Sequence, residues 1–196
     1  MRVCVLSSGS KGNTTYIETS TTRILIDIGN SAKYVKEKLE DLNIDPSSLD
    51  AILITHTHVD HVKGLKVFEK KFNIPVYITE IMLTSLDYLD NYRFISDEFE
   101  IKDIHIQAIK TSHDTADSRG YIVSNSGKSV VYITDTGYIN SKYFAALSDR
   151  NMYIMESNHD VEMLSNGNYP FNLRQRILSD KGHLSNYDSA KYLSSF

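Results

Sequence analysis

Three imidazoles and one carboxylate fall within seven residues of this sequence, at positions 55–61, directly after an apolar run. Imidazole nitrogens bind zinc, iron and related first-row ions, and a carboxylate among several histidines allows one cluster to hold two cations. His56 and His58 are two residues apart, so on extended backbone both side chains project to the same side. Asp60 and His61 come next, where a turn directs them to a second ion. A single histidine is usually a surface or hydrogen-bonded residue, but this spacing predicts a metal site.

Two further candidate ligands follow predicted strands. His113 lies just past the strand region 101–110, and Asp135 ends the strand at 130–134. We expect His113 to supply the third imidazole of the first ion. The two carboxylate oxygens of Asp135 would allow it to bridge two ions at the separation of about 3.5–4 Å that is typical of two-metal hydrolytic sites. Without the histidines, an aspartate at a strand end would be interpreted as a turn or capping residue.

Residues nearer the N-terminus are predicted to support this site. Asp27 ends a short strand and is placed to accept a hydrogen bond from a metal-binding histidine, which would fix the tautomer of that ring. The glycines within positions 8–14 predict a tight turn that either brings Asn13 to the metal cleft, for substrate binding, or forms a plain hairpin. A nucleotide-binding loop is excluded, because the Gly-Lys-Ser/Thr ending is absent and a strand follows.

Two late histidines are also candidates. His159 follows a further predicted strand, and His183 lies just before a predicted helix. Each could be a metal ligand, a proton donor or a structural group, and we assign His159 to substrate binding. His105 lies in the middle of a strand on a polar position and is given no function.

Length and composition limit the class of protein. A chain of 196 residues suits one domain spanning 1–196. Its single cysteine, Cys4, excludes an intrachain disulfide, fits a reducing cytoplasm and is expected to pack in the core. No secretory leader is recognisable, and no apolar run approaches the roughly 20 residues of a membrane span, so we expect a cytoplasmic protein without membrane contact. The net charge of −4 gives no general attraction to nucleic acid.

The periodicity of apolar residues predicts an α/β protein. Strands are expected at 3–6, 14–18, 23–27, 51–55, 76–79, 101–110, 120–125, 129–134 and 152–156. Helices are expected at 31–42, 62–72, 81–90, 141–148, 169–178 and 186–194. Two strand-rich halves with helices outside them indicate a layered α/β sandwich.

With these residues in place, the chain resembles the metallo-β-lactamase superfamily, because the H-x-H-x-D-H segment, His113 and Asp135 occur in the family order and at strand ends. More narrowly, it resembles the bacterial YycJ/WalJ branch, whose members are regarded as DNA exonucleases acting from the 5′ end. That resemblance rests on segments 8–14, 111–114, 134–137, 156–160 and 182–186. It implies a four-layer αββα sandwich with two divalent ions, zinc or manganese, at one edge. It also implies phosphodiester hydrolysis by a metal-activated hydroxide, with nucleic acid as substrate and DNA favoured.

The resemblance also predicts a C-terminally incomplete fold. In similar proteins the segment 182–186 and its helix are followed by a strand that carries the last histidine ligand of the second ion, whereas this sequence ends at Phe196. By position, His183 resembles the histidine that sits over the leaving group and donates a proton, and Asp60 binds the second ion and orients the nucleophile. We therefore expect a weak second metal site unless His183 or a partner chain completes it.

Other functions share these residues. A thiolester hydrolase of the glyoxalase type has the same ligands, and a catalytically impaired metal-binding module would follow from a missing ligand. Hydrolysis of β-lactams is disfavoured, because Asp135 occupies the bridging position and Cys4 is remote from the motif. A basic cluster at Arg174, Arg176 and Lys181 could bind a phosphate backbone, although three such charges are more often solvated surface residues without a binding role. The native metal, the oligomeric state and the choice of DNA or RNA stay open.

Overall fold

The computed structural model describes residues 1–196, which form two compact units. The first unit comprises Met1–Ile106 and Thr115–Asp117, and the second comprises Gln107–Asp114 and Ser118–Phe196. A single domain over the whole chain stays a prediction. No helix combines the length and apolar character needed to cross a membrane.

The first unit contains a six-stranded sheet in the order β1-β2-β3-β4-β5-β6. Its strands are β1 (Arg2–Ser7), β2 (Thr14–Glu18), β3 (Arg23–Ile26), β4 (Ala51–Leu53), β5 (Val76–Ile78) and β6 (Tyr92–Phe94). The first three strands pair antiparallel, and β3 through β6 pair parallel. Parallel strands place their carboxyl ends at the same edge of the sheet, so β3 and β4 end side by side. The strand β6 was not predicted from the sequence.

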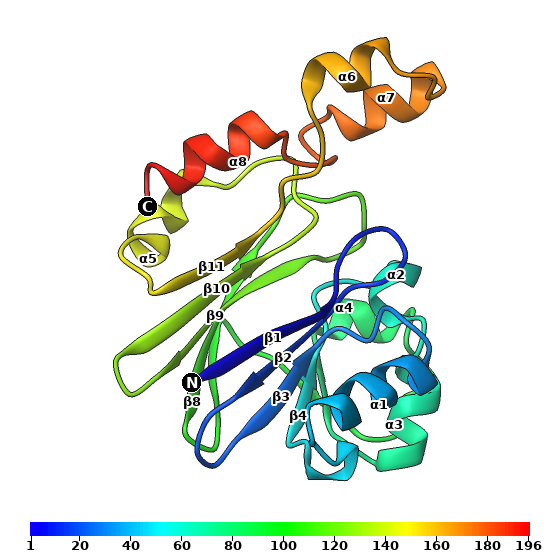
Figure 1. Ribbon diagram of the computed structural model, residues 1–196, viewed down its shortest axis with the longest axis vertical. Helices are drawn as coiled ribbons and strands as arrows, with labels where there is room; N and C mark the ends of the chain where they lie inside the picture. The colour runs from blue at the N-terminus through cyan, green and yellow to red at the C-terminus, as the bar shows by residue number, and fades with distance from the viewer. The chain divides into compact units, whose positions relative to one another are not determined.

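Helices α1 (Ala32–Asp41) and α3 (Leu65–Phe72) lie beside one another against this sheet (Figure 1). Both are amphipathic, and the apolar side chains of Leu39 and Phe68 are fully buried in the same core as strand residue Ile52. Cys4 packs against this core, as predicted.

The predicted helix at 62–72 is wrong in one respect, because the structure divides it at Gly64. A short helix, α2 (Val59–Val62), precedes the break, and α3 follows it. A Cβ atom at Gly64 would lie 2.2 Å from the carbonyl oxygen of Asn30, so only glycine permits this close backbone approach. The helix expected at 81–90 is also shorter, since α4 covers only Glu80–Leu83.

The second sheet has the order β11-β10-β9-β8-β7. Its strands are β7 (Glu98–Ile101), β8 (Ile104–Lys110), β9 (Arg119–Asn125), β10 (Lys128–Ile133) and β11 (Met152–Met155). The predicted hairpin of β9 and β10 turns at Ser126 and Gly127, both with positive φ. The strand region predicted at 101–110 is divided by a turn at Lys102, whose φ is also positive.

Helices of the second unit follow the last strands. They are η2 (Ser141–Tyr143), α5 (Phe144–Leu147), α6 (Val161–Asn166), α7 (Phe171–Ile177) and α8 (Asn186–Leu193). The core of this unit buries Leu147 and Leu184 against the strand residues Val131 and Ile133. Helices α6 and α7 lie side by side and α8 follows them in the chain (Figure 1). Helix α6 was not predicted, because only Leu164 of its residues is buried and its apolar pattern is correspondingly weak.

Candidate metal centre

The histidine and aspartate side chains of residues 55–61 lie at the carboxyl end of β4, as the sequence predicts. His58 is the residue that caps α2, so the chain leaves extended backbone and turns into the helix within the motif. His56 and His61 are buried, and the centroids of their rings are 4.0 Å apart. The ring of His58 lies 4.8 Å from that of His56. One short helix therefore brings the last histidine of the motif back to the first.

A buried carboxylate at the end of the neighbouring strand β3 hydrogen-bonds to one of these histidines. Asp27 follows β3, is fully buried, and accepts a hydrogen bond from His61 Nδ1 at 2.7 Å. It also accepts from the backbone N and the Oγ1 of Thr55, each at 2.8 Å. Burial raises the pKa of the Asp27 carboxyl, and the donors around its oxygens oppose that rise. The predicted hydrogen bond between Asp27 and a motif histidine is confirmed, and it leaves Nε2 as the unprotonated nitrogen of His61.

Asn13 contacts that same histidine. Its backbone N donates to the Asp60 carbonyl at 2.8 Å, and its amide Nδ2 lies 3.1 Å from His61 Nε2. Gly29 makes this approach possible, because a Cβ atom there would lie 1.9 Å from the Asp60 carbonyl oxygen. The turn between β1 and β2 is thus both a hairpin and the element that brings Asn13 to the motif, while its role in substrate binding stays a prediction.

The second unit gathers a further group of candidate ligands. His113 follows β8, Asp135 follows β10, and His183 precedes α8. One ligand atom of each lies within 4.8 Å of those of the other two. His113 Nδ1 donates to the carbonyl of Gly182 at 3.2 Å, so Nε2 is its unprotonated nitrogen. Burial lowers the pKa of His113, which favours the neutral imidazole that binds metal ions.

Glu156 is a site residue that the sequence did not single out. It follows β11, and its Oε1 accepts a hydrogen bond from His183 Nδ1 at 2.6 Å. Its Oε2 accepts from the backbone N of Thr136 at 2.9 Å and of Leu184 at 3.2 Å. Although burial lowers the pKa of His183, the Glu156 carboxylate and then Asp135 raise it more, so the net shift is upward. The sequence did contain one signal that could have identified Glu156. Like the other carboxylates of the site, Glu156 directly follows a strand.

Two further histidines lie outside these groups of candidate ligands, and the role of His159 in substrate binding stays a prediction. His159 forms an isolated β-bridge with Ser185 and lines a cavity of about 680 Å³ beside α6. His105 is exposed on β8, with its Nε2 3.6 Å from a carboxylate oxygen of Glu98.

Comparison with known proteins identifies the family. Residues 22–195 match the family described as Beta-lactamase superfamily domain. The chain belongs to this superfamily. It is accordingly a metal-dependent hydrolase, as predicted from the resemblance.

Individual members of the superfamily agree with this assignment. Exodeoxyribonuclease WalJ of Streptococcus pneumoniae serotype 2 is 39% identical over 197 residues, which cover 95% of this chain and 73% of WalJ. Exodeoxyribonuclease YycJ of Bacillus anthracis is 37% identical over 194 residues, which cover 95% of this chain and 74% of YycJ. The chain thus spans about three quarters of these relatives, and the predicted loss of C-terminal strands stays a prediction.

A solved structure shares the fold at low sequence identity. The metallo-beta-lactamase fold protein YhfI of Bacillus subtilis has a TM-score of 0.78 and 14% identity, and the match covers 98% of this chain and 81% of YhfI. The predicted α/β metallo-β-lactamase fold is therefore confirmed.

The donor atoms fit the divalent cations of the superfamily. The first unit carries His56, His58, Asp60 and His61. The second unit carries the group of His113, Asp135 and His183. Imidazole nitrogen and carboxylate oxygen suit zinc and manganese, and the set contains no thiolate. The hydrogen bonds of His61 and His113 at Nδ1 orient both rings so that Nε2 can bind an ion.

Replacing Asp27 by asparagine is expected to weaken metal binding about 10–100-fold, because the carboxylate that orients His61 loses its charge. Asparagine tolerates the positive φ of this position, which is 63°, so the backbone is preserved. The measurement is a competition titration of Zn²⁺ against a chromophoric chelator. Asp45→Asn, a change at an exposed capping residue, is the control and should bind zinc as the wild type does. Equal zinc affinity in Asp27→Asn and wild type would contradict the role of Asp27.

Proposed function

We propose that this hydrolase cleaves phosphodiester bonds of nucleic acid and is a DNA exonuclease. The names of its relatives WalJ and YycJ, which are exodeoxyribonucleases, support this substrate. The observation that carries the proposal is the hydrogen-bonded pair of His183 and Glu156 beside His113 and Asp135. A histidine that is held by a carboxylate next to a metal site is suited to donate a proton to a leaving oxygen.

The ligands are assigned as follows. On the order of the residues in the sequence, His56, His58 and His113 would hold one ion and Asp60 and His61 would hold the other. Asp135, with two carboxylate oxygens, would serve both. When bound, two such ions lower the pKa of water toward about 7 and neutralise the charge of the phosphate. We propose zinc or manganese, with the second site weaker than the first. Zinc suits a site dominated by imidazole, whereas manganese suits its carboxylates.

His183 and Asp60 act on the protons of the reaction. Because His183 Nδ1 donates to Glu156, its proton for the leaving oxygen is held at Nε2. The Glu156 carboxylate raises the pKa of this imidazole, so its protonated form persists closer to neutral pH. Asp60 lies in the first turn of α2. Its carboxylate would accept a hydrogen bond from the attacking water and so orient the lone pair of that water toward phosphorus.

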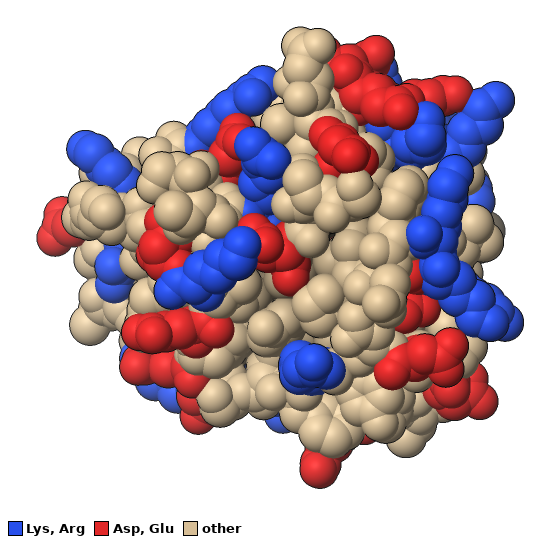
Figure 2. Space-filling model, turned by 90° about the horizontal axis from the view of Figure 1, so that it is seen from below, with Lys and Arg blue, Asp and Glu red and all other residues tan.

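Overall charge does not provide the attraction for DNA. The net charge is −4, and on the face shown in Figure 2 Lys and Arg side chains are interspersed with Asp and Glu. Within the basic cluster of the sequence, Arg176 pairs with Asp114, and Arg174 donates to the carbonyl of Ser165. Binding therefore depends on the ions and on local contacts close to the reacting phosphate.

A substrate screen with added Zn²⁺ or Mn²⁺ tests the proposal. Bis-p-nitrophenyl phosphate and a DNA ladder, single- and double-stranded, should be hydrolysed, and nitrocefin should not. Separate labels at the 5′ and 3′ ends of the DNA report the direction of degradation. Hydrolysis of a thiolester such as S-lactoylglutathione, with neither phosphodiester cleaved, would replace the proposal with a thiolester hydrolase.

A further inference from the structure

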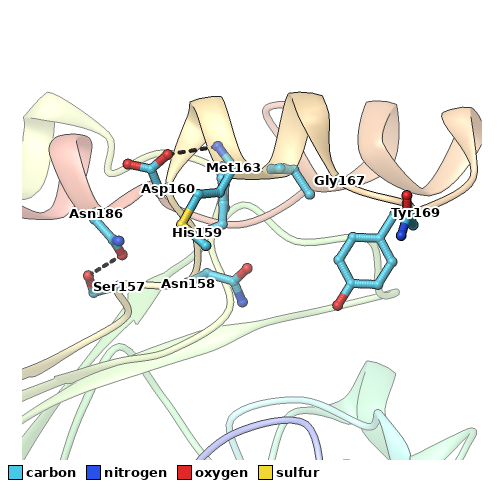
Figure 3. A pocket seen from close by; sticks show the side chains of 10 residues that line it. Ser157, Asn158, His159, Asp160, Met163, Gly167, Tyr169 and Asn186 are labelled. Carbon is cyan, nitrogen blue, oxygen red and sulfur yellow. Dashed lines mark hydrogen bonds between the residues drawn. The ribbon is translucent and has the colours of Figure 1, made fainter.

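A cavity of about 680 Å³ lies beside α6 in the second unit, outside the proposed ligand set. This volume is within the range of small-molecule sites and is sufficient for a nucleotide. Its walls come from the loop after β11, from α6 with the loop that follows it, and from the start of α8. In Figure 3, Tyr169 lies across the opening from Ser157, Asn158 and Asn186.

The polar groups of the cavity suit a ligand that both donates and accepts hydrogen bonds. Asn158, Asn168 and Asn186 line it, and each amide offers donors and an acceptor. Ser157 Oγ donates to Asn186 Oδ1 at 2.7 Å, which orients that amide. Both ring nitrogens of His159 are buried and have no hydrogen-bond partner. A buried polar atom without a partner costs free energy, so the chain itself leaves this position of the cavity wall unsatisfied.

The apolar side of the cavity is unusually exposed. Tyr169 is 57% exposed and Met163 is 76% exposed, and both line the opening. Phe171, at the start of α7 and outside the lining of the cavity, is 65% exposed. Such a group of exposed rings and a flexible thioether is typical of binding surfaces, because aromatic faces supply contact area at low entropic cost. An aromatic ring beside amide groups is the combination that binds the face and the edge of a nucleobase.

The cavity is joined directly to the proton-donating pair. Asn158 lies two residues after Glu156, and its backbone N donates to the Leu184 carbonyl at 3.0 Å. Asn186 lies three residues after His183, and its backbone N donates to the His159 carbonyl at 2.8 Å. The same two chain segments therefore form a wall of the cavity and hold the pair of Glu156 and His183. The cavity is therefore next to the pair that is proposed to act on the leaving oxygen.

We infer that the cavity binds one unpaired nucleobase of a single-stranded DNA end, with Tyr169 stacking on the base and the asparagine amides contacting its edge. The inference rests on the proposed function. Stacking is tolerant of sequence because every base has an aromatic face, and amides can pair with any base edge, so we expect weak base preference. Because a paired base cannot enter, single-stranded or frayed ends should bind more tightly than blunt duplex ends.

Fluorescence anisotropy with hydrolysis-resistant phosphorothioate decamers tests this inference. A series of strands, each with one abasic position, is titrated with the metal-loaded protein. One position is expected to require its base, with Kd rising about tenfold when the base is removed. Tyr169→Ala should raise the Kd of the intact strand by a similar factor, and Tyr169→Phe should bind as the wild type does. Phe94→Ala, at another half-exposed aromatic residue, is the matched control.

The losses from the two changes should not be fully additive, because both remove the stacking contact. Removal of the base at the critical position should therefore raise the Kd of Tyr169→Ala by a smaller factor than that of the wild type. Equal Kd values of the wild type for intact and abasic strands, or no binding of any strand, would overturn the inference. Hydrolysis of bis-p-nitrophenyl phosphate by the wild type, measured in parallel, reports the proposed function separately because this substrate has no base.

Discussion

Asp135→Asn is expected to reduce hydrolysis of bis-p-nitrophenyl phosphate by more than about 100-fold. Loss of a residue that merely orients a ligand reduces metal affinity or activity by about 10–100-fold, so loss of the proposed bridging ligand should reduce activity further. Asparagine keeps the backbone conformation, since Asp135 has a φ of 48° that asparagine tolerates. It removes the negative charge and one of the two oxygens that can bind an ion. Steady-state kinetics measure the loss of activity, and metal analysis of the same preparation measures the loss of bound ions.

Asp149→Asn is the matched control for this change. Asp149 has a similar φ of 56°, is exposed, and lies in the loop before β11. The same atoms are changed in the same backbone conformation, so any loss through folding alone should appear in both variants. Wild-type activity and full metal content in Asp135→Asn would remove Asp135 from the ligand set.

His183→Ala is expected to slow DNA cleavage by about 10²–10⁴-fold, the usual contribution of a general acid. The effect should depend on the leaving group. A departing DNA oxygen needs a proton, whereas p-nitrophenolate is a stable anion, so hydrolysis of bis-p-nitrophenyl phosphate should fall much less. Glu156→Gln should produce the same pattern to a smaller degree, because Glu156 positions His183 and raises its pKa.

Metal analysis distinguishes the proton donor from a metal ligand. The proposed role predicts that His183→Ala retains the metal content of the wild type, although His183 lies within ligand distance of His113 and Asp135. Loss of one ion together with equal losses on both substrates would instead make His183 a ligand. His105→Ala, at an exposed histidine of β8, is the control and should leave both rates and metal content unchanged.

Gly29 and Gly64 allow segments of the first unit to pack closely beside the metal motif. At each glycine, backbone of another segment lies closer than a Cβ atom would permit. Asp60 and Asn13 are joined through their backbones at the first position, and helices α2 and α3 are separated at the second. Close packing of main chain against main chain thus positions the second half of the motif.

The sequence by itself determined the features that depend on neighbours along the chain. The spacing of residues 55–61 after an apolar strand predicted the metal motif, because strand and turn geometry direct side chains that are only a few residues apart. The position of Asp27 at a strand end predicted its hydrogen bond, since adjacent parallel strands end at the same edge. The order of the candidate ligands likewise sufficed to predict the family, which the comparisons confirm.

Only the tertiary structure decided the contacts between distant segments. Glu156 and His183 are 27 residues apart, and no local pattern indicated that the end of β11 lies against the segment before α8. The break at Gly64 depends on the carbonyl of Asn30, which a helical period cannot reveal. The cavity beside α6 is built mostly from exposed residues of separate segments, so it left no apolar periodicity in the sequence. Periodicity records which side chains are buried along one element, whereas these features arise where different elements meet.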